Sequence, residues 1–333
     1  MKNLRILVTG ADGFIGSHLV EALLIRGYTV NAFVLYNSFN SWGWLDNLDL
    51  KNRNNFNVFS GDIRDKQFVE NLVKISDVVV NLAALISIPY SFQSPQSFFD
   101  TNVMGCLNVL ESCLKYKKKK LIQISTSEVY GKVQKVPIKE NFAINAYSPY
   151  AASKISSDQL ALSFYRSYDL PVVIIRPFNT YGPRQSARAI IPTILLQAIN
   201  KEKINLGALH PTRDFTYISD TVNSLILAIH SKDAIGEVIN IGSAFEISIK
   251  DLVNLISKKL NKKILVHKSK IRTRPSNSEV DRLLSSNTKA KKILKWKPVF
   301  SGLKGFEKGL KKTIEWFENE KIYKIYKSNR YNI

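Results

Sequence analysis

The regular alternation of short apolar runs with longer amphipathic segments limits the possible folds of this chain more than any other feature. The apolar runs are rich in β-branched residues and occupy 5–9, 29–34, 56–60, 77–82, 120–125 and 171–176. Segments with helical periodicity, such as 16–26 and 98–115, separate them. Strands that are apolar throughout are typical of a parallel sheet covered by helices on both faces. We therefore expect an α/β chain with a doubly wound parallel sheet, which a later run at 237–242 would rejoin.

The stretch VTGADGFIGSHL connects the first predicted strand to the first predicted helix. Gly10 would permit a tight turn, Gly13 would let the backbone approach a pyrophosphate, and Gly16 would allow close packing of helix on strand. The amides of Phe14 and Ile15 would lie at the start of the helix, where the helix dipole favours phosphate. An ordinary turn can also carry such glycines, but this position between strand and helix predicts a Rossmann dinucleotide site.

The ends of two later strands fit the same ligand. Asp62 and Ile63 follow the third predicted strand, where the carboxylate could accept from an adenine amino group and the isoleucine could pack on the ring. Leu82, Ala83 and Ala84 follow the fourth, where small residues would let a cofactor pass close to the backbone. Both segments could instead be plain turns at strand ends, so they support the glycine loop without proving it.

The pattern divides the chain into two interwoven parts. Residues 1–178 together with about 211–243 are predicted to form the dinucleotide-binding Rossmann domain. The segments from about 179 to 210 and from 244 to 333 have a less regular pattern and would form a smaller α/β substrate-binding lobe. We find no internal repeat and no long flexible linker between them.

Composition excludes several other classes of protein. The net charge is +21, and the segment from Ser257 to Ile333 holds 22 basic and 6 acidic residues. No nucleic-acid-binding motif accompanies this charge, so a solvated basic surface, suited to a phosphorylated substrate, is the simpler interpretation. Cys106 and Cys113 suit neither a disulfide framework nor a metal cluster. No apolar run approaches the roughly 20 residues of a membrane helix, so we expect a cytoplasmic protein with no membrane insertion, no nucleic-acid partner and no metal.

A tyrosine and a lysine provide the first sign of chemistry. Tyr150 and Lys154 in YSPYAASK are four residues apart and would share one face of a helix. An ammonium near a phenol favours the phenolate, so Lys154 is expected to lower the pKa of Tyr150. Such a tyrosine could accept a proton from an alcohol while hydride leaves the same carbon.

Together these motifs resemble those of the extended short-chain dehydrogenases/reductases, in the branch of nucleotide-sugar epimerases, dehydratases and decarboxylases. The matching segments cover nearly the whole chain: VTGADGFIGSHL, GDIRD, NLAA, DTNVMGCLNVLES, STSEVYG, the YxxxK pair, RPFNTYGPRQ, RDFTYISD, NIGS and RPSNSEVDRLLSSNTKAKKILKW. YNSFNSWGWL and RPFNTYGPRQSARAIIPTIL are most similar to the LegB-type NAD-dependent 4,6-dehydratases, a group associated with N-acetylated 6-deoxy sugars for the bacterial surface sugar legionaminic acid. The resemblance implies NAD as cofactor and a nucleotide sugar, UDP- or GDP-N-acetylglucosamine, as substrate.

The resemblance also implies roles for individual residues. Tyr150 would be the redox base, Lys154 would also bind the nicotinamide ribose, Thr126 would bind the sugar O4, and Glu128 would act at C5 and C6. Pro177 would lie at the cofactor. The substrate would meet Asn179, Arg188, Arg213, Arg274 and Glu279.

One departure from the family pattern concerns the elimination of water. Many of these dehydratases place Asp before the catalytic Glu, whereas this chain has Ser127. A hydroxyl is too weak an acid to expel water alone, so Glu128 would pass the C5 proton to O6 itself. STSE also occurs in UDP-glucuronate decarboxylases, which would need a cation near C6, for which Arg184 or Arg188 could serve. A UDP-sugar 4-epimerase and a non-catalytic NAD-binding protein are the remaining alternatives.

A second departure concerns the adenosine ribose. Rossmann folds usually place an acid after the second strand to accept from the 2′-hydroxyl, but this chain has Val34 to Asn37 there. There is no arginine for a 2′-phosphate either. Tyr36, Asn37 and Asn40 could bind a hydroxyl, which favours NAD. Trp42 and Trp44 could pack in the core or flank the cofactor.

The helices at 100–115 and 150–168 lie where the family forms a four-helix dimer interface. Apolar side chains on them could supply that interface or pack in the core: Leu107, Leu110, Leu114, Leu160 and Phe164. We therefore expect a homodimer.

Overall fold

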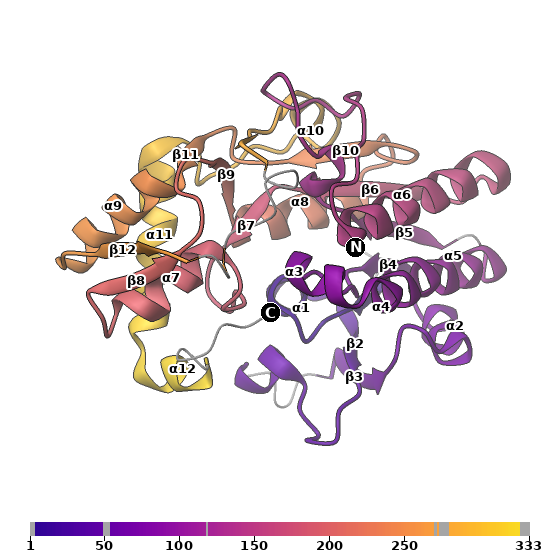
Figure 1. Cartoon of the computed structure of the whole chain (residues 1–333). Coiled ribbons are helices and arrows are strands. Elements are labelled where there is room, and N and C mark those ends of the chain that lie inside the picture. Colours follow the sequence, from indigo (N-terminus) through magenta and orange to yellow (C-terminus); the bar gives the residue numbers. More distant parts are fainter. Residues whose placement is uncertain (1–3, 49–53, 118, 270–271, 273–279, 327–333) are drawn as a thin grey trace.

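Seven parallel strands form the central sheet, in the order β10-β6-β5-β4-β1-β2-β3 (Figure 1). The computed structural model describes residues 4–48, 54–117, 119–269, 272 and 280–326. The strands are β1 (Arg5–Thr9), β2 (Thr29–Leu35), β3 (Phe56–Gly61), β4 (Val78–Asn81), β5 (Lys120–Ile124), β6 (Val172–Pro177) and β10 (Val238–Ile241). All seven predicted strands are therefore confirmed. The order reverses between β1 and β4, and folds of this kind bind their ligands at the carboxyl ends of the two strands where the order reverses.

Helices cover both faces of this sheet. Helices α1 (Phe14–Ile25) and α8 (Ile218–His230) pack on one face, while α2 (Lys66–Lys74), α5 (Gly105–Lys115) and α6 (Pro149–Tyr168) pack on the other. Side chains alternate along each strand, so Ile6 and Val8 belong to the first core and Leu7 to the second. Burial on both faces explains why the strands at the centre of the sheet, such as β1 and β4, are largely apolar, whereas the edge strand β3 has no buried residue.

The segment 98–115, predicted as one helix, contains three elements. After α3 (Ile88–Gln93) come α4 (Pro95–Phe98), a π-helical stretch η2 (Phe99–Met104) and then α5. The widened turn contains Asn102, whose side chain accepts from the Leu85 amide at 2.8 Å and donates to the Leu85 carbonyl at 3.0 Å. Its amide also donates to the Ser153 hydroxyl at 2.9 Å. Asn102 thus joins the segment after β4 to helix α6, and this tertiary role could not be read from helical periodicity.

The second lobe is built on two smaller sheets. Strand β9 (Thr212–Tyr217) pairs with β7 (Asn179–Tyr181), β11 (Glu246–Ser248) and β13 (Arg282–Leu283), and β8 (Lys203–Leu206) pairs with β12 (Leu265–Lys268). The lobe also contains α7 (Ile190–Ala198), α9 (Ile249–Leu260), α11 (Gly302–Glu318) and α12 (Glu320–Ile325), with α10 (Thr288–Ile293) beside β10. The segment from Thr212 to Tyr217, which the sequence division assigned to the Rossmann part, forms β9 of this second lobe.

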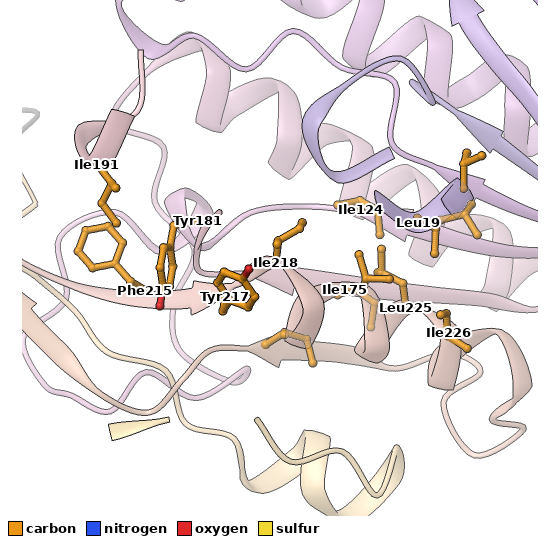
Figure 2. Close-up of a cluster of buried hydrophobic side chains, with 14 of the residues drawn as sticks. Leu19, Ile124, Ile175, Tyr181, Ile191, Phe215, Tyr217, Ile218, Leu225 and Ile226 are labelled. Carbon is orange, nitrogen blue, oxygen red and sulfur yellow. The ribbon is translucent and has the colours of Figure 1, made fainter. Parts of the chain in front are cut away.

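The two lobes share one hydrophobic core. Figure 2 shows side chains of the central sheet and its helices, such as Leu19, Ile175 and Leu225, in one cluster with Tyr181 and Phe215 of the second lobe. The two lobes therefore form one structural unit with a common core rather than two independent domains. None of the described helices is long and apolar enough to cross a lipid bilayer.

Candidate active site

The glycine loop is shaped for a close ligand. Gly10 has a φ of +64°, and a Cβ there would lie 2.9 Å from the Ala83 nitrogen. A Cβ on Gly16 would lie 2.1 Å from the Gly10 carbonyl oxygen. Gly13 differs, because it is exposed and a Cβ there would meet only the Gly10 carbonyl, at 3.3 Å. Among the described residues no side chain caps α1, so the amides of its first turn face the open side of Gly13.

A buried chain of polar side chains holds the wall opposite this loop. The amides of Leu82 and Ala83 donate to the Thr9 hydroxyl at 3.1 and 3.0 Å. Thr9 donates to Asn81 at 2.6 Å, and Asn81 donates to Gln123 at 2.8 Å. This network links the ends of β1, β4 and β5 and places Leu82 to Ala84 beside Gly10. Sequence reasoning missed it, although polar residues at the ends of apolar strands were a signal.

Both residues predicted to bind adenine, Asp62 and Ile63, make contacts within the protein. Asp62 accepts from the Arg64 guanidinium at 2.6 Å, and this hydrogen bond holds the pKa of the Asp62 carboxyl below its usual value. Ile63 is 6% exposed and packs against Gly105 of α5, so little of its surface is left for a ring. Both adenine contacts stay predictions.

The loop after β2 is held by its own side chains. The Asn37 amide donates to the Ser41 carbonyl at 2.8 Å, and its oxygen accepts from the Phe39 and Ser41 amides at 3.1 and 3.2 Å. Asn37 is therefore committed to the loop, and Tyr36 points to solvent with 68% exposure. Neither geometry favours the predicted ribose contacts.

The two tryptophans that follow differ in their surroundings. Trp44 packs edge-on against Trp316 of α11, with ring centroids 5.9 Å apart, and against Tyr326 at 5.7 Å. Trp44 thus packs in the core and fastens the loop to the C-terminal helices, while Trp42 is 38% exposed.

The catalytic candidates meet where β5 ends and α6 begins. Thr126 caps the 3-10 helix η3 (Ser127–Tyr130) by accepting from the Glu128 amide at 3.2 Å. Ser148 caps α6 by accepting from the Ala151 amide at 3.1 Å, which puts Tyr150 in the first turn. Thr126 and Tyr150 hydrogen-bond through their side chains, and Glu128 is near enough for its charge to act on Tyr150. Glu128 is the more accessible of these groups, whereas Ser127 is 3% exposed.

The electrostatics of the Tyr150–Lys154 pair differ from the prediction. Burial raises the pKa of Tyr150, and the hydrogen bond with Thr126 only partly opposes that rise. Lys154 donates to the Ile124 carbonyl at the end of β5, and burial lowers the pKa of its ammonium. The expectation that Lys154 depresses the Tyr150 pKa is therefore wrong for this structure, because desolvation dominates.

A buried ionic network lies directly behind this pair. Asp158 is one helical turn beyond Lys154 and fully buried. Its carboxylate accepts from Arg176 Nε at 3.0 Å and from the Ser125 hydroxyl at 2.8 Å. Arg176 also donates to Tyr130 at 3.0 Å. Sequence reasoning missed this network, although an acid four residues after the candidate lysine was a visible signal.

The predicted substrate residues lie at different depths of the second lobe. Asn179 begins β7, with one residue, Phe178, between it and the end of β6 at Pro177, and Arg188 is exposed in the loop before α7. Arg213 is 7% exposed and donates to the carbonyls of Thr212 and Val280, both at 2.8 Å. One guanidinium nitrogen of Arg213 therefore holds the backbone of its own lobe. Arg274 and Glu279 lie outside the described residues, so their roles stay predictions.

The fold and the site define an extended short-chain dehydrogenase/reductase. A glycine loop follows the first strand of a doubly wound sheet, Thr126 follows β5, and Tyr150 and Lys154 lie on α6 beside it. The family model for GDP-mannose 4,6 dehydratase matches residues 7–313. The chain belongs to this nucleotide-sugar dehydratase and epimerase family.

Individual relatives cover both activities. A putative UDP-glucose 4-epimerase of Methanocaldococcus jannaschii is 33% identical over 94% of this chain and 98% of its own length. The solved dTDP-glucose 4,6-dehydratase of Bacillus anthracis, in complex with NAD, is 32% identical with a TM-score of 0.83, covering 97% of this chain and 99% of that one. A UDP-glucuronic acid 4-epimerase from Bacillus cereus, solved in complex with UDP-glucuronic acid and NAD, is 30% identical with a TM-score of 0.86, covering 97% of this chain and 100% of that one.

Proposed function

We propose that this protein is an NAD-dependent nucleotide-sugar 4,6-dehydratase. The observation that carries the proposal is the meeting of Thr126, Glu128 and Tyr150 at one strand end, beside a glycine loop that fits a pyrophosphate. A redox base alone would serve an epimerase, but a carboxylate beside it adds a group able to remove a second proton. The proposed substrate is UDP- or GDP-N-acetylglucosamine, and the proposed role is in bacterial surface-sugar synthesis of the legionaminic acid type.

The first step would be oxidation at C4 of the hexose. When bound, NAD would supply the acceptor for the C4 hydride and, after water has left, the hydride that C6 receives while C5 takes a proton from solvent. Thr126 would orient O4, and Tyr150 would take the O4 proton. The raised Tyr150 pKa means that the phenolate must be stabilised when the site is filled. We propose that the Lys154 ammonium, four residues further along the same helix, supplies this stabilisation.

The second step would be loss of water between C5 and C6. A ketone at C4 makes the C5 proton acidic, and Glu128 would remove it and deliver it to O6, which leaves as water. Burial of Ser127 argues that this residue supports Glu128 rather than acting as an acid itself. One carboxylate would thus do the work that two share elsewhere in the family.

Two alternatives make different use of the same site. A decarboxylase would need a cation near C6, but Arg184 is paired with Glu21 at 2.8 Å on helix α1. An epimerase needs only the C4 chemistry, and the relatives named as epimerases keep this alternative open.

The deciding experiment incubates the purified protein with UDP-GlcNAc, GDP-GlcNAc, dTDP-glucose and UDP-glucuronate and measures product masses. A dehydratase gives a product lighter by one water, with deuterium from D₂O at C5. Loss of CO₂ would favour the decarboxylase instead, and an isomer of unchanged mass would favour the epimerase. Tyr150→Phe is the matched control and should abolish each of these reactions.

A further inference from the structure

An aspartate inside the glycine loop lies against the end of strand β2. The Asp12 carbonyl accepts from the Trp44 amide at 3.1 Å, and the preceding Ala11 amide donates to the Phe33 carbonyl at 3.1 Å. Gly43, with a φ of +58°, packs on Asp12 so closely that an added Cβ would lie 3.0 Å from the Asp12 Cβ. The glycine loop, the end of β2 and the 3-10 helix η1 (Gly43–Asn47) therefore meet at this residue.

A carboxylate in a phosphate-binding loop is unfavourable unless it points away from the phosphates, because like charges repel. The hydrogen bonds of the Asp12 carboxylate indicate the direction in which it points. Partial burial raises the pKa of the Asp12 carboxyl, and two backbone hydrogen bonds, from its own amide and from Leu35, the last residue of β2, act against that rise. The carboxylate thus lies toward the end of β2 rather than over the helix N-terminus.

The charged neighbours leave this carboxylate without a salt bridge in the described part of the chain. Asp46 is turned to the loop itself, accepting from the Ser41 hydroxyl at 2.7 Å and the Trp42 amide at 3.0 Å. Arg64, at the end of β3, is held by Asp62. A partly buried carboxylate without a counter-charge is costly, which is a reason to look for a ligand donor at this place.

The end of β2 is where Rossmann folds bind the adenosine ribose. The residues that follow β2 cannot easily do so here, since Tyr36 points to solvent and Asn37 is committed to its loop. We propose that the Asp12 carboxylate accepts from the adenosine ribose hydroxyls of NAD and repels the 2′-phosphate of NADP. The acid that the sequence lacks after β2 is thus supplied from the glycine loop. This inference rests on the proposed use of NAD but not on which sugar reaction follows.

The test measures dinucleotide binding rather than turnover. Apoprotein is titrated by calorimetry with NAD, NADP and the NAD analogue that lacks the adenosine 2′-hydroxyl. Asp12→Asn keeps the size of the side chain, and Asp12→Ala serves as a second variant if the first folds poorly, as judged by circular dichroism. Asp77→Asn is the matched control, because it removes one negative charge beside Arg5 at the amino ends of β1 and β4, whereas the glycine loop follows the carboxyl end of β1.

We expect Asp12→Asn to weaken NAD binding by about 10- to 100-fold, the usual value of a hydrogen bond to a charged group. The 2′-deoxy analogue should lose much less, NADP should bind no worse than before, and Asp77→Asn should change nothing. Wild-type affinity of Asp12→Asn for NAD would overturn the inference while leaving NAD use intact. Equal losses for NAD and its deoxy analogue would also overturn it, since Asp12 would then act through the shape of the loop.

Discussion

Replacing Asp158 by Asn should weaken this protein strongly, although the side chain never reaches the surface. Asp158 is fully buried, and Arg176 opposite it is 3% exposed. Burial raises the pKa of the Asp158 carboxyl, and the charge of Arg176 opposes that rise, with N–O distances of 2.9 and 3.0 Å. Removing one partner of such a pair leaves the other charge buried and uncompensated, which costs roughly 3–5 kcal/mol. Against a total stability of about 5–15 kcal/mol, this is a large fraction.

The assay is urea unfolding followed by fluorescence, which reports the free energy of unfolding of each variant. Glu320→Gln removes one member of an exposed pair with Lys324 and should cost less than about 1 kcal/mol. The double variant Asp158→Asn/Arg176→Met should be more stable than Asp158→Asn alone, because no charge is left in the core. A loss below about 1 kcal/mol for Asp158→Asn would refute the reasoning and show that Arg176 finds water or another partner.

Four further predictions concern the site, the fold and the assembly. Glu128→Gln should lower formation of the 6-deoxy product by roughly 10²–10⁴-fold and leave NADH and a 4-keto sugar bound, seen by absorbance; product formation at the normal rate would remove Glu128 from the C5 step. Burial lowers the pKa of His18 to about 4, so stability should fall by about 3 kcal/mol as pH drops from 6.5 towards 4, and urea unfolding of His18→Gln should show a flatter profile. Gly10→Ala should reduce NAD affinity and the melting temperature, because its Cβ would lie 2.9 Å from the Ala83 nitrogen; unchanged values would mean that the loop can move aside. Light scattering should give a dimeric mass at micromolar concentration, although Leu110 cannot contribute to the interface since it is fully buried in the core.

Local patterns in the sequence were enough to predict the central sheet. The strands at the centre of the sheet could be located because a strand covered on both faces is largely apolar, as β1 and β4 show in consecutive residues. The edge strand β3 shows this less clearly, since none of its residues is buried. Gly10 and Gly16 were assignable for a similar reason, since only glycine fits where the backbone of another segment approaches so closely. The segment 98–115 is helical as predicted, but its π-helical turns, where Asn102 reaches Leu85, were not foreseen, since that contact is tertiary.

Short-range features were sufficient to assign the class of this protein, since strand pattern, glycine spacing and the Tyr150–Lys154 interval can all be read along the chain. The pKa values and hydrogen bonds of these side chains depend instead on the tertiary structure. Lys154 donates to Ile124, thirty residues earlier, and Asp214 accepts from Ser243 and Ser285, which no local pattern connects. Burial is likewise a property of the assembled fold, and it raises the pKa of Tyr150 where the Tyr150–Lys154 spacing alone indicated the reverse. The free energy of a charge depends on everything that surrounds it in space, and the chain specifies those surroundings only after it has folded.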